Sequence, residues 1–274
     1  MKNIIFSIVI CIIFMAVQTV YALTVTPTDV ATVLVDEILG SEIIVTSSSY
    51  TGATGSAGLF SGAGSAIGID SGIMLTSGSA SLAVGPNNES SAGANNLFAG
   101  SSELDSIISG TTYDAAILDI DFTTTTGNIF FNFVFASEEY NEWVGSFNDV
   151  FAFFLDGANI ALLPNGDPVS INNVNLGANS AYYIDNESGI YDIEYDGFTT
   201  VLTAQALDLS AGSHRLSIQI ADASDGELDS AVFVQGGTFG GVTPGPSPVP
   251  EPGTILLIGV GLVALAGLQR SRRQ

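Results

Sequence analysis

The chain has little of three residue types on which many protein functions depend: basic residues, histidine and cysteine. Only five Lys and Arg residues oppose 28 Asp and Glu residues. Four of the five basic residues lie in the terminal segments, which leaves Arg215 alone in the body of the chain. A body this acidic will not bind nucleic acid, because a phosphate backbone needs Lys and Arg to displace its counterions. It will instead attract cations.

The scarcity of cysteine and histidine excludes further classes of site. Cys11 is the only cysteine and falls in the N-terminal apolar segment, so the rest of the chain has no disulfide and no thiol chemistry. A single histidine excludes a His-rich zinc site and, without cysteine, a Cys-His pair. That histidine, His214, follows Ala211-Gly-Ser, a turn composition, and we expect it to be a solvated turn residue.

The N-terminal segment has the layout of a secretory signal peptide. Lys2 precedes an apolar run from Ile4 to Val17, and the small-residue end Val20-Tyr-Ala follows. We therefore predict a signal peptide over residues 1–22, cleaved after Ala22, and a mature protein outside the cytoplasm.

The C-terminal segment is a second apolar stretch with polar flanks. A Gly/Pro linker, residues 241–249, is followed by an apolar run and a basic end within residues 250–274. The run from Gly253 to Leu268 has 16 residues, fewer than the ~20 that a helix needs to span a bilayer comfortably. One interpretation is a plain membrane anchor with its basic end inside. The motif that opens the segment is Pro250, Glu251 and Pro252.

Residues 23–240 have the pattern of one all-β domain with a single helix. The hydrophobic content of 46% can build one substantial core, and all-β domains often run to about 200–250 residues as one unit. A helix is predicted over residues 27–40, where Val30, Leu34 and Ile38 share a face and Gly40 ends it. Turn-rich short strands follow, so we predict a jelly-roll-like β-sandwich with this helix packed on it.

Two features of the strands are specific enough to test. Residues 115–123 alternate, which places Asp119 and Asp121 on the exposed face of a half-buried strand. The apolar runs at 201–209 and 215–221 flank a Ser-Ala-Gly-Ser turn, so we predict that they form a hairpin.

Two acidic loops lie between buried strands, at residues 138–149 and 222–229. Ile129 to Ala136, which leads into the first loop, is apolar on both faces, as in a central strand. Clustered carboxylates repel each other unless a cation neutralises them, and Ca²⁺ prefers carboxylate and amide oxygens. Neither loop has EF-hand spacing, so ligands would have to come together from separate loops; the alternative is solvated acidic turns. The predicted calcium ligands are Glu138, Glu139, Asn141, Asn148, Asp149, Asp222, Asp225 and Asp229.

Two other interpretations use the same loops. A glycosidase needs two carboxylates, and the candidates are Glu138, Glu139, Glu142 and Asp149. Because crowded polar groups favour shared ion ligation over a general acid of raised pKa, we predict that the chain is not an enzyme. In a binding module, Trp143 and Tyr140 would stack on a ligand, although aromatic side chains in such loops also serve to fill the core.

The stretch FASEEYNEWVGSFNDVFAFFLDG, residues 135–157, resembles the signature of the bacterial choice-of-anchor L domain family. Further segments support the resemblance from about Leu23 to Gly240, among them Gly72-Ile-Met-Leu-Thr-Ser-Gly and Tyr195-Asp-Gly-Phe-Thr-Thr. The resemblance implies a secreted protein that ends in a surface-sorting signal. The C-terminal segment is similar to a PEP-CTERM sorting signal, which implies that an exosortase-type protease cuts near Glu251 at the membrane and passes the body to the surface.

Together these features predict a secreted, surface-sorted, non-enzymatic domain of the bacterial envelope or extracellular matrix. We expect an inner-membrane intermediate, calcium-stabilised loops and an adhesive or matrix role. The expected partners are the exosortase-type protease and a polysaccharide or matrix protein. The alternative is a carbohydrate-active enzyme, a glycosidase that uses loop carboxylates.

Overall fold

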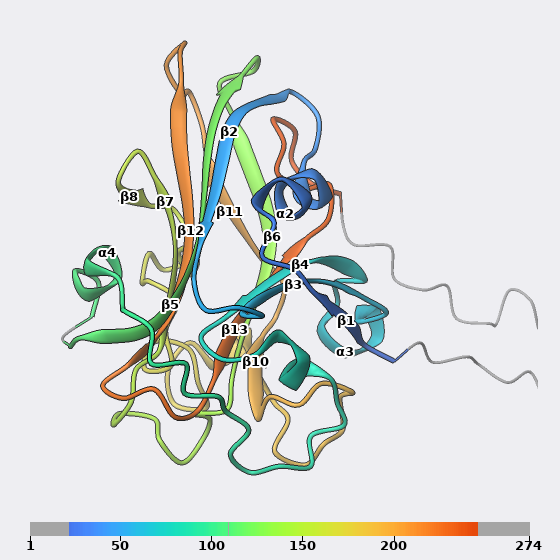
Figure 1. Ribbon diagram of the computed structural model, residues 1–274, viewed down its shortest axis with the longest axis vertical. Coiled ribbons are helices and arrows are strands. Elements are labelled where there is room, and N and C mark those ends of the chain that lie inside the picture. Colours follow the sequence, from blue (N-terminus) through green and yellow to red (C-terminus); the bar gives the residue numbers. More distant parts are fainter. Residues whose placement is uncertain (1–21, 109, 246–274) are drawn as a thin grey trace, which may run out of the picture. The chain divides into compact units, whose positions relative to one another are not determined.

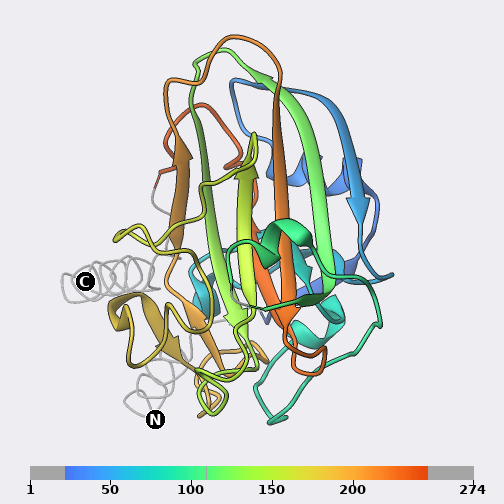
Figure 2. The same cartoon turned by 90° about the vertical axis from the view of Figure 1, so that its left-hand side faces the viewer.

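The computed structural model describes residues 22–108 and 110–245 as two antiparallel β-sheets packed face to face (Figures 1 and 2). This confirms the all-β class with few helices. The predicted signal peptide and C-terminal sorting segment lie outside the described residues. Among the helices of the described part, none has the length and apolar character needed to cross a membrane.

The larger sheet has the strand order β1-β3-β4-β13-β6-β10-β9, and β11 pairs with β6 as well. β10 and β11 follow one another along the same edge of β6, opposite residues 136–137 and 129–133. The strands are β1 (Thr24–Pro27), β3 (Ala57–Ser61), β4 (Ser71–Thr76), β6 (Ile129–Ser137), β9 (Tyr183–Asp185), β10 (Gly197–Thr199), β11 (Leu202–Ala206) and β13 (Ser230–Gln235).

The smaller sheet has the order β2-β5-β12-β7-β8. Its strands are β2 (Ile43–Thr51), β5 (Thr112–Thr124), β7 (Val150–Leu155), β8 (Ala158–Asn159) and β12 (His214–Ala223). The helical elements are short: α2 (Ala31–Ile38), α3 (Gly64–Ile67), α4 (Ser102–Asp105), and the 3₁₀ turns η1 (Ala80–Ala83) and η2 (Ser180–Tyr182).

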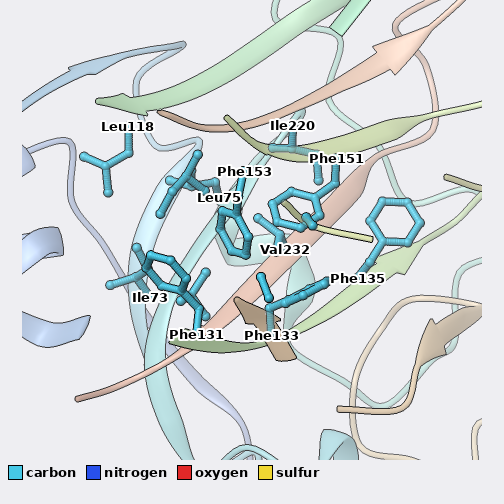
Figure 3. Close-up of a cluster of buried hydrophobic side chains, with 14 of the residues drawn as sticks. Ile73, Leu75, Leu118, Phe131, Phe133, Phe135, Phe151, Phe153, Ile220 and Val232 are labelled. Carbon is cyan, nitrogen blue, oxygen red and sulfur yellow. The ribbon is translucent and has the colours of Figure 1, made fainter. Parts of the chain in front are cut away.

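Phenylalanine side chains of β6 and β7 meet between the two sheets (Figure 3). The Phe131 ring stacks on Phe153 with centroids 5.0 Å apart, and Phe133 lies 5.2 Å from Phe151. Each large apolar side chain that is fully buried contributes about 1.5–3 kcal/mol. The opposite face of β6, including Val134, packs in a second buried cluster, so β6 is buried on both faces as predicted.

The N-terminal helix is shorter than predicted. It extends from Ala31 to Ile38, and residues 28–30 connect it to β1, an edge strand that ends at Pro27 and pairs with β3. Leu34 and Ile38 join the core, whereas Val30 is 54% exposed just before the first turn. Periodicity alone could not separate these parts, because a short strand next to a helix supplies apolar residues without a clear period of its own.

The predicted hairpin between residues 201–209 and 215–221 is wrong. β11 pairs with β6 in the larger sheet, whereas β12 pairs with β5 and β7 in the smaller one. The connection between them therefore crosses from one sheet to the other. His214 is also not a solvated turn residue: it begins β12, is 6% exposed and lies 2.7 Å from Asp156. The turn residues before His214 indicate that the chain reverses there, but they do not indicate whether the next strand joins the same sheet or the other one.

Candidate functional site

The two acidic loops both cross between the sheets at the same end of the sandwich (lower end of Figure 2). The first connects β6 to β7, and the second connects β12 to β13. Ser137 at the end of β6 is paired with Ser230 at the start of β13, and the Glu138 amide donates to the Asp229 carbonyl at 3.0 Å. The structure thus brings together two segments that the sequence could place only separately; we call this region the acidic end.

A third segment, residues 79–98, wraps over the acidic end. The Asp229 carboxylate accepts hydrogen bonds from the Ala94 amide at 3.0 Å and the Ser79 amide at 3.3 Å. The Asp114 carboxylate accepts from the amides of Asn96 and Phe98. These carboxylates therefore hold a long turn-rich segment in place through its backbone.

Three buried carboxylates at the acidic end lack hydrogen-bond donors. No donor among the described residues meets hydrogen-bond geometry at either oxygen of Glu138 or of Asp222, or at Oε2 of Glu139, and each residue is at most 2% exposed. The Ala92 backbone lies near Glu138 and lowers its pKa only in part. The Ser77 hydroxyl lies near Asp222 and lowers its pKa in part, but the carbonyl to which it donates a hydrogen bond, at 3.4 Å, is that of Ser230. An unpaired buried charge costs several kcal/mol, so these groups need a proton or a cation.

Asp149 differs from these three because the protein supplies its donors. Its oxygens accept hydrogen bonds from the Ala223 amide at 2.9 Å and the Ser230 hydroxyl at 2.6 Å. Since Ala223 and Ser230 flank the second acidic loop, Asp149 ties that loop to the first one. A predicted ligand therefore also acts as a structural link between the loops.

The titration properties of the acidic end follow from burial. Burial raises the pKa of Glu138 to about 9 and that of Glu139 to about 8. It also raises the pKa of Asp149 and of Asp229 to about 7, and holds that of Asp222 well above its usual range. Without a cation, several of these groups hold protons at neutral pH. A bound cation would displace those protons, because metal ligands must be deprotonated.

The donor set at the acidic end consists of oxygen atoms, which suits a hard cation such as Ca²⁺. Within residues 22–108 and 110–245, no three Asp, Glu, His or Cys side chains form a ready-made metal cage. The carboxylates gather at one end of the sandwich without converging on one point. The identity of the predicted ligands stays a prediction.

The predicted amide ligands are already engaged by protein donors. Oδ1 of Asn141 accepts from the Tyr183 hydroxyl at 2.8 Å, and its amino group donates to Glu187 at 3.0 Å. Oδ1 of Asn148 accepts from the Asn172 amide at 2.8 Å. Both side chains brace the loop in this structure. Asp225, another predicted ligand, is half-buried in the second loop.

The prediction that Tyr140 stacks on a ligand is wrong. Its side chain is fully buried, its hydroxyl donates to the Val174 carbonyl at 2.7 Å, and its ring lies 4.8 Å from Tyr183. It fills the core beneath the loop, because the first turn after β6 directs it inward. Trp143 is 42% exposed and contacts Phe147 edge to face, so its role as a ligand platform stays a prediction.

Comparison with protein families gives two matches. Residues 23–240 match the model of the choice-of-anchor L domain. The chain belongs to the choice-of-anchor L domain family. Residues 248–273, which include Pro250, Glu251 and Pro252, match the PEP-CTERM protein-sorting motif. This motif identifies an exported, surface-sorted protein and implies processing by exosortase after association with the membrane. No curated protein and no solved structure matches the chain.

Three buried acidic residues of this choice-of-anchor L domain were not among the predicted site residues: Asp114, Glu194 and Asp196. Asp196 accepts from the Asn87 side chain at 2.7 Å, and burial raises its pKa to about 6. The charges of Asp196 and Glu194 add to the raised pKa of Glu138. Asp114 stands alone among neutral residues, whereas Glu194 and Asp196 form a short acidic run with Asp192 that was not among the predicted site segments. Only the fold brings them to the acidic end.

Two open pockets flank the acidic end of the choice-of-anchor L domain. One has a volume of about 370 Å³ and is lined by carboxylates and amides, including Glu142, Glu187 and Asp196. The other has a volume of about 390 Å³ and combines aromatic with acidic side chains, including Tyr113 and Asp225. Both pockets therefore have acidic side chains in their lining.

Proposed function

We propose that this protein is a non-enzymatic, calcium-stabilised module that acts in adhesion or matrix association after export and surface sorting. One observation carries the proposal: buried carboxylate oxygens of Glu138, Glu139 and Asp222 have no donor from the described residues. Calcium supplies the missing positive charge, and an exported protein meets it at concentrations that extracellular modules with Kd of about 10⁻⁴–10⁻³ M can use.

The charges around the unpaired oxygens give candidate ligand sets. Glu139 interacts with the charges of Asp149 and Asp225, and Asp222 interacts with those of Asp149 and Asp229. Two carboxylates ~5 Å apart repel by roughly 3 kcal/mol at an effective dielectric of about 20. This is a large share of the 5–15 kcal/mol by which a domain is typically stable. A cation that binds carboxylates from both loops would replace their mutual repulsion by attraction and would hold the two loops together.

Direct measurement of metal binding tests the proposal. The exported protein is freed of metal with a chelator and titrated with CaCl₂ at pH 7 in two buffers of different ionisation enthalpy. We expect saturable binding with release of protons, because calcium displaces protons from carboxyls of raised pKa. Magnesium should bind more weakly, since it requires a tighter octahedron. Absence of heat and of proton release in both buffers would mean that the buried carboxyls hold protons instead of calcium, and would contradict the proposal.

The absence of enzymatic activity is part of the same proposal. Of the glycosidase candidates, Glu138 and Glu139 have at most 2% of their surface exposed, so a substrate cannot reach them without a change in structure. We expect no turnover when the protein is screened against polysaccharides and model esters. Activity that disappears on Glu138→Gln or Glu139→Gln would favour the carbohydrate-active enzyme instead.

We infer that the sandwich is a jelly roll. The order β4-β13-β6-β11 lies opposite β5-β12-β7-β8, and from β4 to β7 and from β11 to β13 each connection changes sheet. This supports the topology of a jelly roll, in which eight strands form two interlocked Greek keys. Because one fold hosts many functions, the topology does not decide between an adhesive module and an enzyme.

Processing at both ends completes the proposed route to the surface. We expect the mature protein to begin at Leu23 and to lack residues 255–268. Intact-mass measurement of surface-extracted protein tests both ends at once. Replacement of Pro250 and Glu251 by alanine should leave the protein at the inner membrane, whereas a mature protein that retains its apolar tail would show that the segment is a plain anchor.

A further inference from the structure

The pocket of about 390 Å³ beside the acidic end has an unusual lining for so acidic a protein. Two aromatic side chains open into it, Phe98 and Tyr113, which are 37% and 42% exposed. Leu97 next to them is 90% exposed. Large apolar side chains held at the surface of a pocket mark a binding surface more often than isolated ones do. The other side of the pocket carries the carboxylates of Asp225 and Glu227.

The aromatic side of this pocket is held by a buried carboxylate. Asp114 accepts hydrogen bonds from the amides of Asn96 and Phe98, while its own amide donates to the Phe98 carbonyl at 3.1 Å. Residues Ala99 and Tyr113 form an antiparallel bridge directly beside this contact. Phe98 and Tyr113 therefore lie on backbone segments that are fixed to each other, and a ligand that stacks on them does not have to order them first.

The polar side of the pocket approaches the aromatic side closely at Gly226. A Cβ atom at this position would lie 3.0 Å from Oδ2 of Asp114 and 3.6 Å from the Asn95 side chain. Oδ1 of Asn95 accepts from the Leu97 amide at 3.1 Å, which leaves its amino group as a donor for a ligand. The pocket thus offers aromatic faces, carboxylate acceptors and an amide donor around one volume.

We propose that this pocket binds an uncharged sugar ring of a polysaccharide. The C–H face of a pyranose packs on aromatic rings, and its hydroxyls donate to carboxylates and accept from amide N–H groups. Charge decides between kinds of sugar: Asp225 and Glu227 contribute two carboxylates, and none of the lining residues that the structure describes is basic. An acidic sugar would be repelled, whereas a neutral one replaces water at the same acceptors. The inference rests on the proposed matrix role and names its ligand class.

A glycan array tests the inference on the exported protein in calcium buffer. The array carries neutral glucans, galactans and mannans, and uronic-acid polymers for comparison. We expect retention on at least one neutral polysaccharide and none on the uronic-acid polymers. Isothermal titration with an oligosaccharide of the retained polymer should show that Tyr113→Ala and Phe98→Ala each weaken binding about ten-fold.

Leu162→Ala is the matched control, because it removes a large apolar side chain of similar exposure, 38%, from a pocket that shares no lining residue with this one, and it should leave the affinity unchanged. Tyr113→Ala should keep its calcium-dependent melting shift, which separates the failure of this inference from the failure of calcium binding. Retention of uronic-acid polymers alone, no retention of any glycan, or loss of binding in Leu162→Ala with full binding in Tyr113→Ala would each overturn the inference.

Discussion

The two ends of strand β12 place acidic side chains in opposite surroundings. At its start, Nδ1 of His214 lies 2.7 Å from Asp156, and the Arg215 guanidinium lies 2.8 Å from Asp119. At its other end, both carboxylate oxygens of Asp222 are buried without a donor from the described residues. Arg215 and Asp222 are seven residues apart in one strand, which spans about 23 Å. This exceeds the Debye length of about 8 Å, so the cations at one end do not neutralise the acids at the other.

The difference between the two ends of β12 predicts which end contributes more to the free energy of unfolding of the domain. Exposed ion pairs contribute at most about 1 kcal/mol, and Arg215 is 62% exposed in its pair with Asp119. Unpaired buried carboxylates cost more than this each, so the acidic end dominates. Under the proposed calcium binding, the missing charge comes from outside the protein. The domain would then reach full stability only after export.

The largest expected effect is the loss of calcium itself. An ion that binds only the folded state stabilises it by about 2.7 kcal/mol at a hundredfold excess over Kd. For a domain of this size, chelation should therefore lower the melting temperature by about 5–10 °C. Circular dichroism melts with calcium, with chelator and with magnesium measure the shift. If the melting curves with calcium and with chelator superimpose, calcium does not stabilise the acidic end, and the proposed difference between the two ends of β12 is wrong.

Removal of one unpaired carboxylate should sharpen the comparison. Asp222→Asn keeps the shape of the side chain but removes its charge, so we expect the calcium-dependent shift to fall below about 2 °C. The metal-free variant should be at least as stable as the metal-free protein at pH 8, because a buried charge is gone. Asp121→Asn is the control, since Asp121 accepts from the Ser47 hydroxyl and lies away from the acidic end. An equal loss in both variants would contradict a local effect.

The pH dependence of the metal-free protein should have the sign set by raised carboxyl pKa values. Burial raises the pKa of Glu138 from 4.5 to about 9 and that of Asp229 from 3.8 to about 7. The folded state therefore holds protons that the unfolded state loses, and this contribution is complete below about pH 4. It is lost as the pH rises towards 9, by several kcal/mol in total. Urea unfolding at pH 5, 7 and 9 measures the decline, which saturating calcium should suppress.

The sequence predicted the parts of the fold that depend on local patterns. β6 is buried on both faces because Phe131, Phe133 and Phe135 alternate with apolar neighbours, and that alternation is visible without a structure. Leu118 and Ile120 likewise point inward, with Asp119 between them on the other face. The sheet to which each strand belongs was not predictable, since the turn before His214 is compatible with a hairpin and with a crossover.

The candidate site was predictable only in part. The adjacent acids Glu138 and Glu139 indicate the first loop, whereas Asp114 is surrounded by neutral residues and gives no such signal. Asp196 belongs to an acidic run with Asp192 and Glu194, but only the fold shows that it lies at the acidic end. Tyr140 shows the opposite failure: it stands within the acidic loop but is a core residue. The order of residues shows which side chains are neighbours along the chain, but it does not show whether a side chain faces the solvent or the core.

A smaller effect is expected at the start of β12 from Arg215→Gln. The Arg215–Asp119 pair is largely solvent-exposed on the arginine side, so its loss should lower the free energy of unfolding by less than about 1 kcal/mol. The effect should shrink further in 0.5 M NaCl, because salt screens exposed charges. Chemical denaturation at two salt concentrations measures both. A loss larger than that caused by chelation would reverse the ranking of the two ends of β12.

The smallest effect is expected from His214→Gln, and its sign can be worked out. The hydrogen bond to Asp156 and the one to the Ser210 carbonyl outweigh burial and raise the pKa of His214 above 6.5. Burial alone would raise the pKa of Asp156, but the Arg215 amide and the His214 ring lower it instead. The histidine contribution is complete below pH 6.5 and lost as the pH rises through the folded value, whereas that of Asp156 is lost only as the pH falls below about 4. In saturating calcium, His214→Gln should therefore lower the melting temperature more at pH 5.5 than at pH 9. An equal loss at both pH values would show that the ring acts through packing alone.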